Sequence, residues 1–309
     1  MASEHRKLES SPGRTTSGRT SLPPQYEAAD YELSRLHLTA STSSESLPKY
    51  EPVSQPGAPS TSSFSPSSAT GLEATHVFQV ETHGHPLFAL PISPRPDPIL
   101  VYSVLPTGEI GPEVYQSLRE KRNSGSCTLV RAGDGGQGQM PVCNTAYRFG
   151  PYRPPKIRLL GDVAHDQDFE VHDKACHTRA QVIRTHLGTF RWRYASRAEC
   201  KAIGASSLLV LDLITTVAAA GGAKQGERRR AVAQLVRNET LRTQGTGGTT
   251  AGNGGRLLVD LRNWVDSKGE AQQMEVLVIA SCITMLKKEV DRRRMHQLIV
   301  IAGGASGGP

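Results

Sequence analysis

Thirteen consecutive residues near the end of the chain, Met274 to Leu286 (MEVLVIASCITML), carry one charge and offer no polar face. A helix on a globular surface keeps one side polar, whereas a helix that is apolar all round is buried on every side. Thirteen helical residues rise about 20 Å, which is too short for the ~30 Å core of a bilayer. The segment therefore predicts a helix that the rest of the chain encloses.

The helical pattern starts at Gly269 and continues through KKEVDRRRMHQLIVIA to about residue 302, where Gly303 and Gly304 are expected to end it. Before it come short apolar runs separated by Gly, Pro, Asp and Ser, which are typical of an antiparallel all-β domain. The runs are 76–80, 87–90, 99–104, 127–131, 145–149, 156–160, 168–172, 188–194, 208–213, 231–237 and 256–261. We predict a mainly β fold, a closed antiparallel barrel of about 12 strands around the hydrophobic C-terminal helix.

The run TFRWRY shows the strand alternation most clearly. It places Phe190, Trp192 and Tyr194 on one face and Arg191 and Arg193 on the other. The aromatic face is expected to be structural. So are the helix residues Leu277, Ile279, Cys282 and Met285.

Residues 1–71 are rich in Ser, Thr and Pro and cannot bury enough apolar surface to offset their chain entropy. We predict a disordered tail there and the barrel in residues 72–309, with the helix at about 270–302. No charged, apolar and small-residue succession opens the chain, so a secretory signal is not expected, and no run of roughly 20 apolar residues occurs. Five cysteines without CxxC pairs fit reduced thiols. These features favour a cytoplasmic protein, with the membrane periphery and the nucleus as alternatives.

A run of about a dozen strands followed by a wholly apolar helix resembles the tubby C-terminal-like superfamily, which includes the tubby domain, the LURP-one-related proteins and the phospholipid scramblases. VYQSLREKRNSGSCTLVR, HLGTFRWRYASRAECKAIGASSLLVLD and AGNGGRLLVDLRNW look like stretches of a fungal protein family, over about residues 72–302. The resemblance implies a non-enzymatic role, either phosphoinositide binding or lipid movement. Scrambling is not expected, because KKEVDRRR interrupts the apolar helix.

The tail carries two related motifs, a PPxY ligand of WW domains and a looser LPxY variant. Their defining residues are Pro23, Pro24 and Tyr26 in the first and Leu47, Pro48 and Tyr50 in the second. Prolines favour an extended polyproline helix that fits an aromatic groove, and the tyrosine adds an anchor. The motifs predict a WW-domain partner, for which a ubiquitin ligase is the natural candidate. A Pro- and Ser-rich tail also produces such motifs by chance.

The chain has a formal charge of +7, and the first 72 residues hold six basic and seven acidic side chains, so the excess lies in the folded part. Basic residues cluster at 148–158, 179–197, 228–230 and 287–294. Such surfaces attract anionic partners. Arg191 and Arg193 are candidates for binding lipid headgroups, although outward strand positions are polar in any case. Nucleic acid is not expected, since no recognition helix, RNP-like motif or zinc finger occurs.

No catalytic, cofactor or metal site is predicted. The segment 165–177 (HDQDFEVHDKACH) holds ligand-type residues without the paired spacing of zinc sites. GxSxG, HExxH and phosphate-loop motifs are absent in their required context. The glycines of 243–255 predict a flexible surface loop. The alternative is an enzyme with an unrecognised site in the barrel mouth, for which converging polar groups such as His172, Asp173 and His177 would be evidence.

Overall fold

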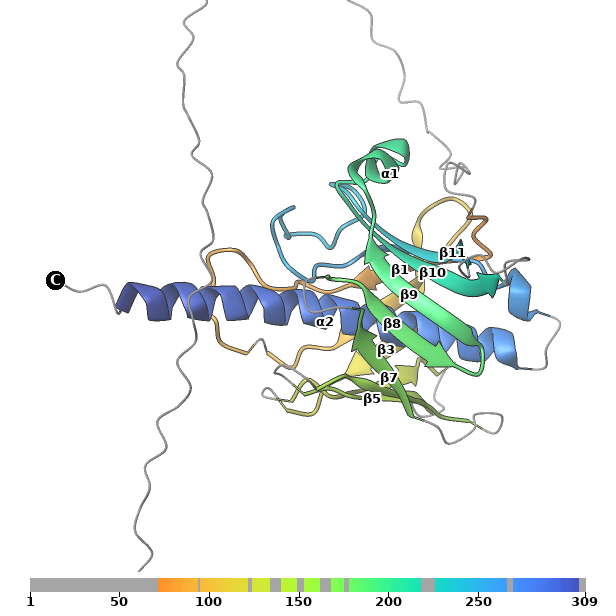
Figure 1. Ribbon diagram of the computed structural model, residues 1–309, viewed down its shortest axis with the longest axis horizontal. Coiled ribbons are helices and arrows are strands. Elements are labelled where there is room, and N and C mark those ends of the chain that lie inside the picture. The colour runs from red at the N-terminus through yellow and green to blue at the C-terminus, as the bar shows by residue number, and fades with distance from the viewer. Residues whose placement is uncertain are drawn as a thin grey trace, which may run out of the picture. The chain divides into compact units, whose positions relative to one another are not determined.

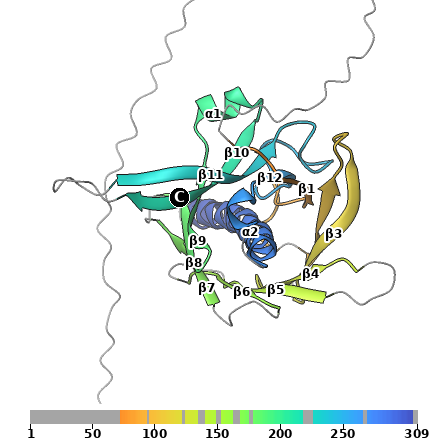
Figure 2. The same cartoon turned by 90° about the vertical axis from the view of Figure 1, so that its right-hand side faces the viewer.

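A computed structural model describes residues 72–93, 95–121, 124–133, 140–148, 153–161, 168–174, 178–217, 226–265 and 269–305. In these ranges twelve antiparallel strands form a closed barrel, and one long helix runs through it (Figure 1 and Figure 2). The predicted fold class is confirmed. The two tail motifs and His177 lie outside the described residues.

The strands follow one another around the barrel in chain order. They are β1 (His76–Glu81), β2 (Ile99–Val104), β3 (Ile110–Leu118), β4 (Cys127–Arg131), β5 (Met140–Ala146), β6 (Lys156–Leu159), β7 (Asp168–Asp173), β8 (Gln181–Thr185), β9 (Gly188–Tyr194), β10 (Ser207–Val217), β11 (Gly226–Arg237) and β12 (Gly255–Val259). The barrel closes where β1 pairs with both β2 and β12. Closure matters because it leaves no strand edge unpaired.

The observed strands differ from the predicted runs in four places. β3 and β8 were not predicted, because Gly111 and Pro112 in β3 and the short polar QVIRT of β8 weaken the strand pattern. β5 begins at Met140 rather than at residue 145. The run 87–90 is not a strand but an exposed turn. Pro86 and Pro91 flank it, and proline cannot donate a ladder hydrogen bond.

Helix α2 (Glu270–Ala305) fills the barrel. From Val276 to Leu286 every side chain is buried, and these residues share one core with the inward side chains of the strands. The indole of Trp192 on β9 donates a 3.0 Å hydrogen bond to the Ser281 hydroxyl of the helix. The prediction that strands enclose the apolar helix is therefore confirmed. The helix extends past Gly303, slightly beyond its expected end.

Outside the barrel, the short helix α1 (Arg197–Ala202) follows β9 and begins with a capping box between Ser196 and Glu199. A second apolar cluster forms where Cys200 and Ile203 pack near Leu208 and Val210 of β10. This cover explains why β10 reads as a continuous apolar run rather than an alternating one. No helix among the described residues is both long and apolar enough to cross a membrane.

Candidate functional site

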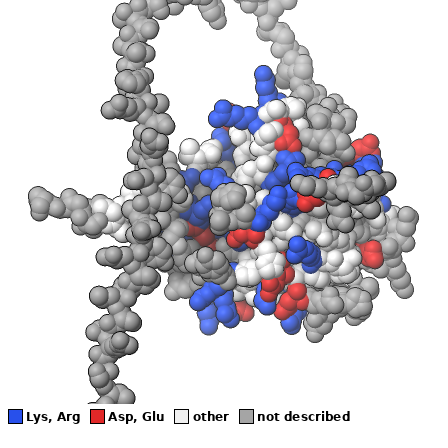
Figure 3. All heavy atoms as spheres, viewed as in Figure 1, with Lys and Arg blue, Asp and Glu red and all other residues white. Residues whose placement is uncertain are grey.

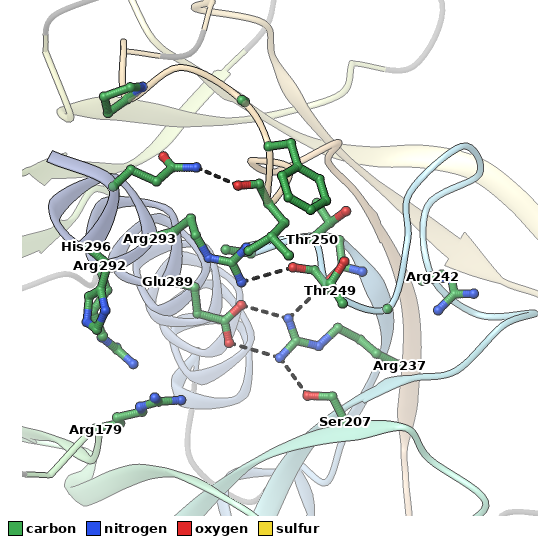
Figure 4. A pocket seen from close by; sticks show the side chains of 18 of the residues that line it. Arg179, Ser207, Arg237, Arg242, Thr249, Thr250, Glu289, Arg292, Arg293 and His296 are labelled. Atoms are coloured by element: carbon green, nitrogen blue, oxygen red, sulfur yellow. Dashed lines mark hydrogen bonds and ion pairs between the residues drawn. The ribbon is translucent and has the colours of Figure 1, made fainter. Parts of the chain in front are cut away.

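A cavity of about 710 Å³ lies where α2 leaves the barrel (Figure 4). It is bounded by the loop before β2, the ends of β9, β10 and β11, the loop 243–253 and one face of α2. Its polar and charged lining includes Arg179, Ser207, Arg237, Arg242, Thr249, Asn253, Glu289, Arg292, Arg293 and His296. Because the barrel interior is filled by the helix, this cavity opens beside the helix at the barrel mouth.

An ion pair between Arg237 of β11 and Glu289 of α2 forms the floor of the cavity. Arg237 donates to both carboxylate oxygens at 2.8 and 2.9 Å. The same carboxylate accepts from the Tyr194 hydroxyl at 2.6 Å and the Gly252 amide at 2.9 Å. Burial opposes ionisation of Glu289, but Arg237 outweighs it and holds the pKa of the carboxyl below its usual value. The pair joins three elements of the mouth, and both oxygens of the Glu289 carboxylate already accept hydrogen bonds from within the protein.

The remaining basic side chains of the cavity have no such partner among the described residues. They are Arg179, Arg242, Arg292, Arg293 and His296, and we call this set the cationic pocket. Glu289 is the single carboxylate among the described lining residues, and Arg237 occupies it. Within the described part of the chain, Arg179, Arg292 and Arg293 form no ion pair, and Arg242 reaches Glu239 only at 4.0 Å. The pocket therefore holds uncompensated positive charge.

The side chains of the cationic pocket come from distant parts of the sequence. In Figure 4, Arg179 and Arg292 lie at one end of the cavity and Arg242 lies at the other. Arg293 donates to the Thr249 carbonyl at 3.0 Å. Its Nη1 atom is buried and has no hydrogen-bond partner among the described residues. A buried donor without a partner costs free energy, which an anionic ligand would recover.

The loop 243–255 is exposed over most of its first half, as expected of a surface loop, but its last residues pack closely against their neighbours. A Cβ at Gly252 would lie 2.6 Å from the Leu286 carbonyl of α2, and a Cβ at Gly254 would lie 2.0 Å from the Val80 carbonyl. The glycines thus permit close contact with the helix and with β1. They position Thr249 and Asn253 in the cavity wall.

The two predicted headgroup residues lie outside the cationic pocket. Arg191 donates to Glu227 at 2.7 Å, and its side chain is buried. Arg193 donates to Asp212 at 2.7 Å and binds both carboxylate oxygens of Glu199. Both lie on the strand face opposite Phe190 and Trp192 as predicted, but Arg191 is buried and the charges of both are paired within the protein. In Figure 3, basic side chains are spread over several elements with acidic ones between them.

A second cavity of about 790 Å³ lies against another face of α2. Cations and carboxylates are mixed there: Glu81, Arg95, Asp97, Arg119, Lys287, Asp291 and Arg294. The Tyr147 hydroxyl donates to Asp291 at 2.7 Å. This cavity lacks the single sign of charge that distinguishes the cationic pocket.

Of the residues named for an enzymatic site, the two that the structure describes are His172 and Asp173, and each pairs with a different element. His172 pairs with Glu170 at 3.1 Å, and Asp173 accepts from Lys288 at 3.3 Å. Neither lines either cavity. Within the described ranges, no group of three or more His, Cys, Asp or Glu side chains has the geometry of a metal site.

The sequence indicated parts of the cationic pocket, because Arg179 and the 287–294 cluster were recognised as basic. It did not indicate the Arg237–Glu289 pair. Two features of the sequence could have revealed this pair. Arg237 ends a run of apolar residues that reads as a strand buried on both faces, and Glu289 is an acidic residue within an otherwise basic helix segment. No protein-family model, curated protein or solved structure matches the chain.

Proposed function

We propose that the barrel is a non-enzymatic binding module whose cationic pocket holds the anionic headgroup of a membrane phospholipid. One observation supports this most. Four arginines and a histidine converge on one cavity where the only carboxylate among the described lining residues is already paired. Arginine binds phosphate oxygens through two parallel N–H donors, which suits a phosphodiester or phosphomonoester.

The walls of the cavity also suit a lipid. Leu87, Phe88, Leu90, Val300 and Ile301 line it on the side away from the barrel. A cationic interior next to an apolar rim matches an anionic headgroup attached to acyl chains. The closed barrel around a buried helix is compatible with the tubby C-terminal-like superfamily, and we include membership of it in the proposal.

Vesicle flotation tests the barrel proposal. We expect the full-length chain to float with vesicles of phosphatidylcholine and phosphatidylserine, and with vesicles containing phosphoinositide, but not with phosphatidylcholine alone. Each cation near an anionic surface contributes about 1 kcal/mol, so Arg179→Gln with Arg292→Gln should weaken binding about thirtyfold. Higher salt should weaken wild-type binding, because ions screen the attraction.

The matched control is Arg228→Gln with Arg229→Gln. It removes the same charge at the other end of β11, nine residues or roughly 30 Å from Arg237. Equal losses in both double variants would show nonspecific attraction rather than a site. Failure of the wild type to float at either salt concentration would remove the lipid proposal. Wild-type binding with a selective loss at the pocket supports it.

The tail half of the proposal concerns a protein partner. The PPxY motif ending at Tyr26 and the LPxY motif ending at Tyr50 are proposed to bind WW domains, which would make the protein an adaptor. Tyr26→Ala removes the anchor of the full PPxY motif and should strongly weaken capture by an immobilised WW domain, whereas Tyr31→Ala, a tyrosine outside both motifs, should not. Equal capture of wild type and Tyr26→Ala would end this half of the proposal.

A further inference from the structure

A group of large apolar side chains is exposed at the protruding end of α2 and in the loop that precedes β2. We call it the apolar tip; it comprises Phe88, Leu90, Ile92, Leu298, Ile299, Val300 and Ile301. Phe88 is 97% exposed and Val300 is 73% exposed. Single exposed apolar residues are ordinary, but a group at one end of a molecule marks a contact with something apolar.

The two parts of the apolar tip are held together. The Gln297 amide of α2 donates to the Leu87 carbonyl at 2.9 Å, and its oxygen lies 3.0 Å from the His85 ring. One turn earlier, Arg294 donates to the Ser93 hydroxyl at 3.1 Å. These bonds fix both ends of the loop against the helix. The loop therefore presents its apolar side chains beside the end of α2.

The way the exposed apolar side chains are distributed around the end of α2 distinguishes a bilayer from a protein groove as the partner. Successive helical residues turn by about 100°, so the four residues 298–301 point to all sides. Their exposed fractions are 41, 62, 73 and 55%, so every side of the helix end is partly exposed. A protein groove contacts one face of a helix, through residues three and four apart. An apolar medium on every side of a helix end is a property of a bilayer.

The length of the exposed apolar end of α2 is close to the thickness of the interfacial layer of a bilayer. The residues from Leu298 to the end of α2 at Ala305 rise about 12 Å, slightly more than the 5–10 Å to which interfacial segments are buried. They are far too few to cross the ~30 Å hydrocarbon core. Arg293 precedes Ile299 by six residues, or about 9 Å along the axis. With the apolar tip in the acyl boundary, Arg292, Arg293 and His296 would lie at the level of anionic headgroups.

We infer that the apolar tip inserts end-on into the interfacial layer of an anionic bilayer, which brings the cationic pocket to the headgroups. This inference rests on the proposed function and adds the orientation of the bound protein. The barrel then stands on the membrane with α2 directed toward it. The opposite end of the helix, near Glu270, faces away from the lipid.

Site-specific fluorescence tests the orientation with the full-length chain. Ile299→Trp places an indole in the apolar tip, and Val265→Trp places one at the other end of α2, where Val265 is 65% exposed. Trp192 and Trp264 are buried and give both variants the same background. With vesicles of phosphatidylcholine and phosphatidylserine carrying brominated acyl chains, the indole at 299 should be quenched and the one at 265 should not.

A second measurement separates the apolar tip from the cationic pocket. Ile299→Ser with Val300→Ser should weaken partition into the same vesicles by about tenfold per side chain, because apolar surface no longer leaves water. Binding of soluble glycerophosphoserine, followed by NMR, should not change. Ile110→Ser with Met140→Ser removes two exposed apolar side chains elsewhere and should leave both measurements unchanged.

Three results would overturn the inference. Vesicle binding without quenching at position 299 would reject the insertion and leave the proposed function standing. Absence of wild-type vesicle binding would reject both. A wild-type dimer in sedimentation that the Ser variant converts to monomer would assign the apolar tip to a second copy of the chain.

Discussion

The ion pair of Arg237 and Glu289 offers the sharpest test of how the barrel mouth holds its helix. The two side chains are 6 and 9% exposed, and the carboxylate accepts four hydrogen bonds from three elements. Glu289→Gln removes the charge and aims an amide donor at the donors of Arg237. The change leaves a buried guanidinium without a counter-ion.

Breaking a buried pair on one side costs about 3–5 kcal/mol, because the remaining charge is desolvated and uncompensated. For a domain of this size, each kcal/mol lowers the melting temperature by about 2–4 °C, so a fall of roughly 10 °C is expected. The pKa of Glu289 is lowered in the fold, so the stabilisation is present above the unfolded value of 4.5 and is lost as pH falls through the folded value. The variant should therefore differ most from wild type at neutral pH.

Urea unfolding followed by the emission of Trp192 and Trp264 measures the free energy, and an unchanged m-value would show that the end states are the same. Glu170→Gln is the control, because its pair with Lys156 at 3.0 Å is solvent-exposed and should contribute less than about 1 kcal/mol. The double change Arg237→Met with Glu289→Leu should cost much less than the sum of the single changes.

A Glu289→Gln variant that stayed within about 1 kcal/mol of wild type at pH 7 would show that the buried pair does not stabilise the barrel mouth. The same conclusion would follow if the losses of Arg237→Met and Glu289→Leu, measured singly, added up to the loss of the double variant, since additivity means that the side chains do not interact.

Two further predictions concern a glycine and a carboxylate. Gly254→Ala should cost at least about 3 kcal/mol in urea unfolding, because its Cβ would lie 2.0 Å from the Val80 carbonyl. Gly247→Ala in the same loop, with no atom closer than 3.9 Å, should cost under about 1 kcal/mol, and similar losses would contradict this reading. Arg193 lowers the pKa of Glu199 from 4.5 to about 2, so this stabilisation should disappear as pH falls through that window. Thermal melts against pH should show less acid sensitivity in Glu199→Gln; identical profiles would rule out the contribution.

The architecture was readable from local patterns. The stretch 274–286 is apolar all round, and the alternation of Phe190, Arg191 and Trp192 marks a half-buried strand. Both follow from the periodicity of a single element and from its need to leave water. The expectations that were wrong also concerned single segments. Prolines 86 and 91 turned an apolar run into an exposed loop, and the last glycines of 243–255 provide close packing that was not expected of a surface loop.

The site was readable only in part, because it depends on which elements become neighbours. Composition placed the positive charge in the folded part, but it equally suggested Arg191 and Arg193, which pair with Glu227, Asp212 and Glu199. Arg179 and Arg292 are 113 positions apart in the chain, yet both line the same cavity. To predict which charged side chains form ion pairs, one needs the distances between them in the fold, and spacing in the sequence does not give these distances.

The sequence by itself determined that an apolar helix must be enclosed by strands, because hydrophobic burial depends on residue type and periodicity rather than on direction. Only the tertiary structure decided which arginines are neutralised and which remain to face a ligand. Hydrogen bonds and ion pairs act over about 3 Å and depend on geometry, so the register and closure of the barrel select them.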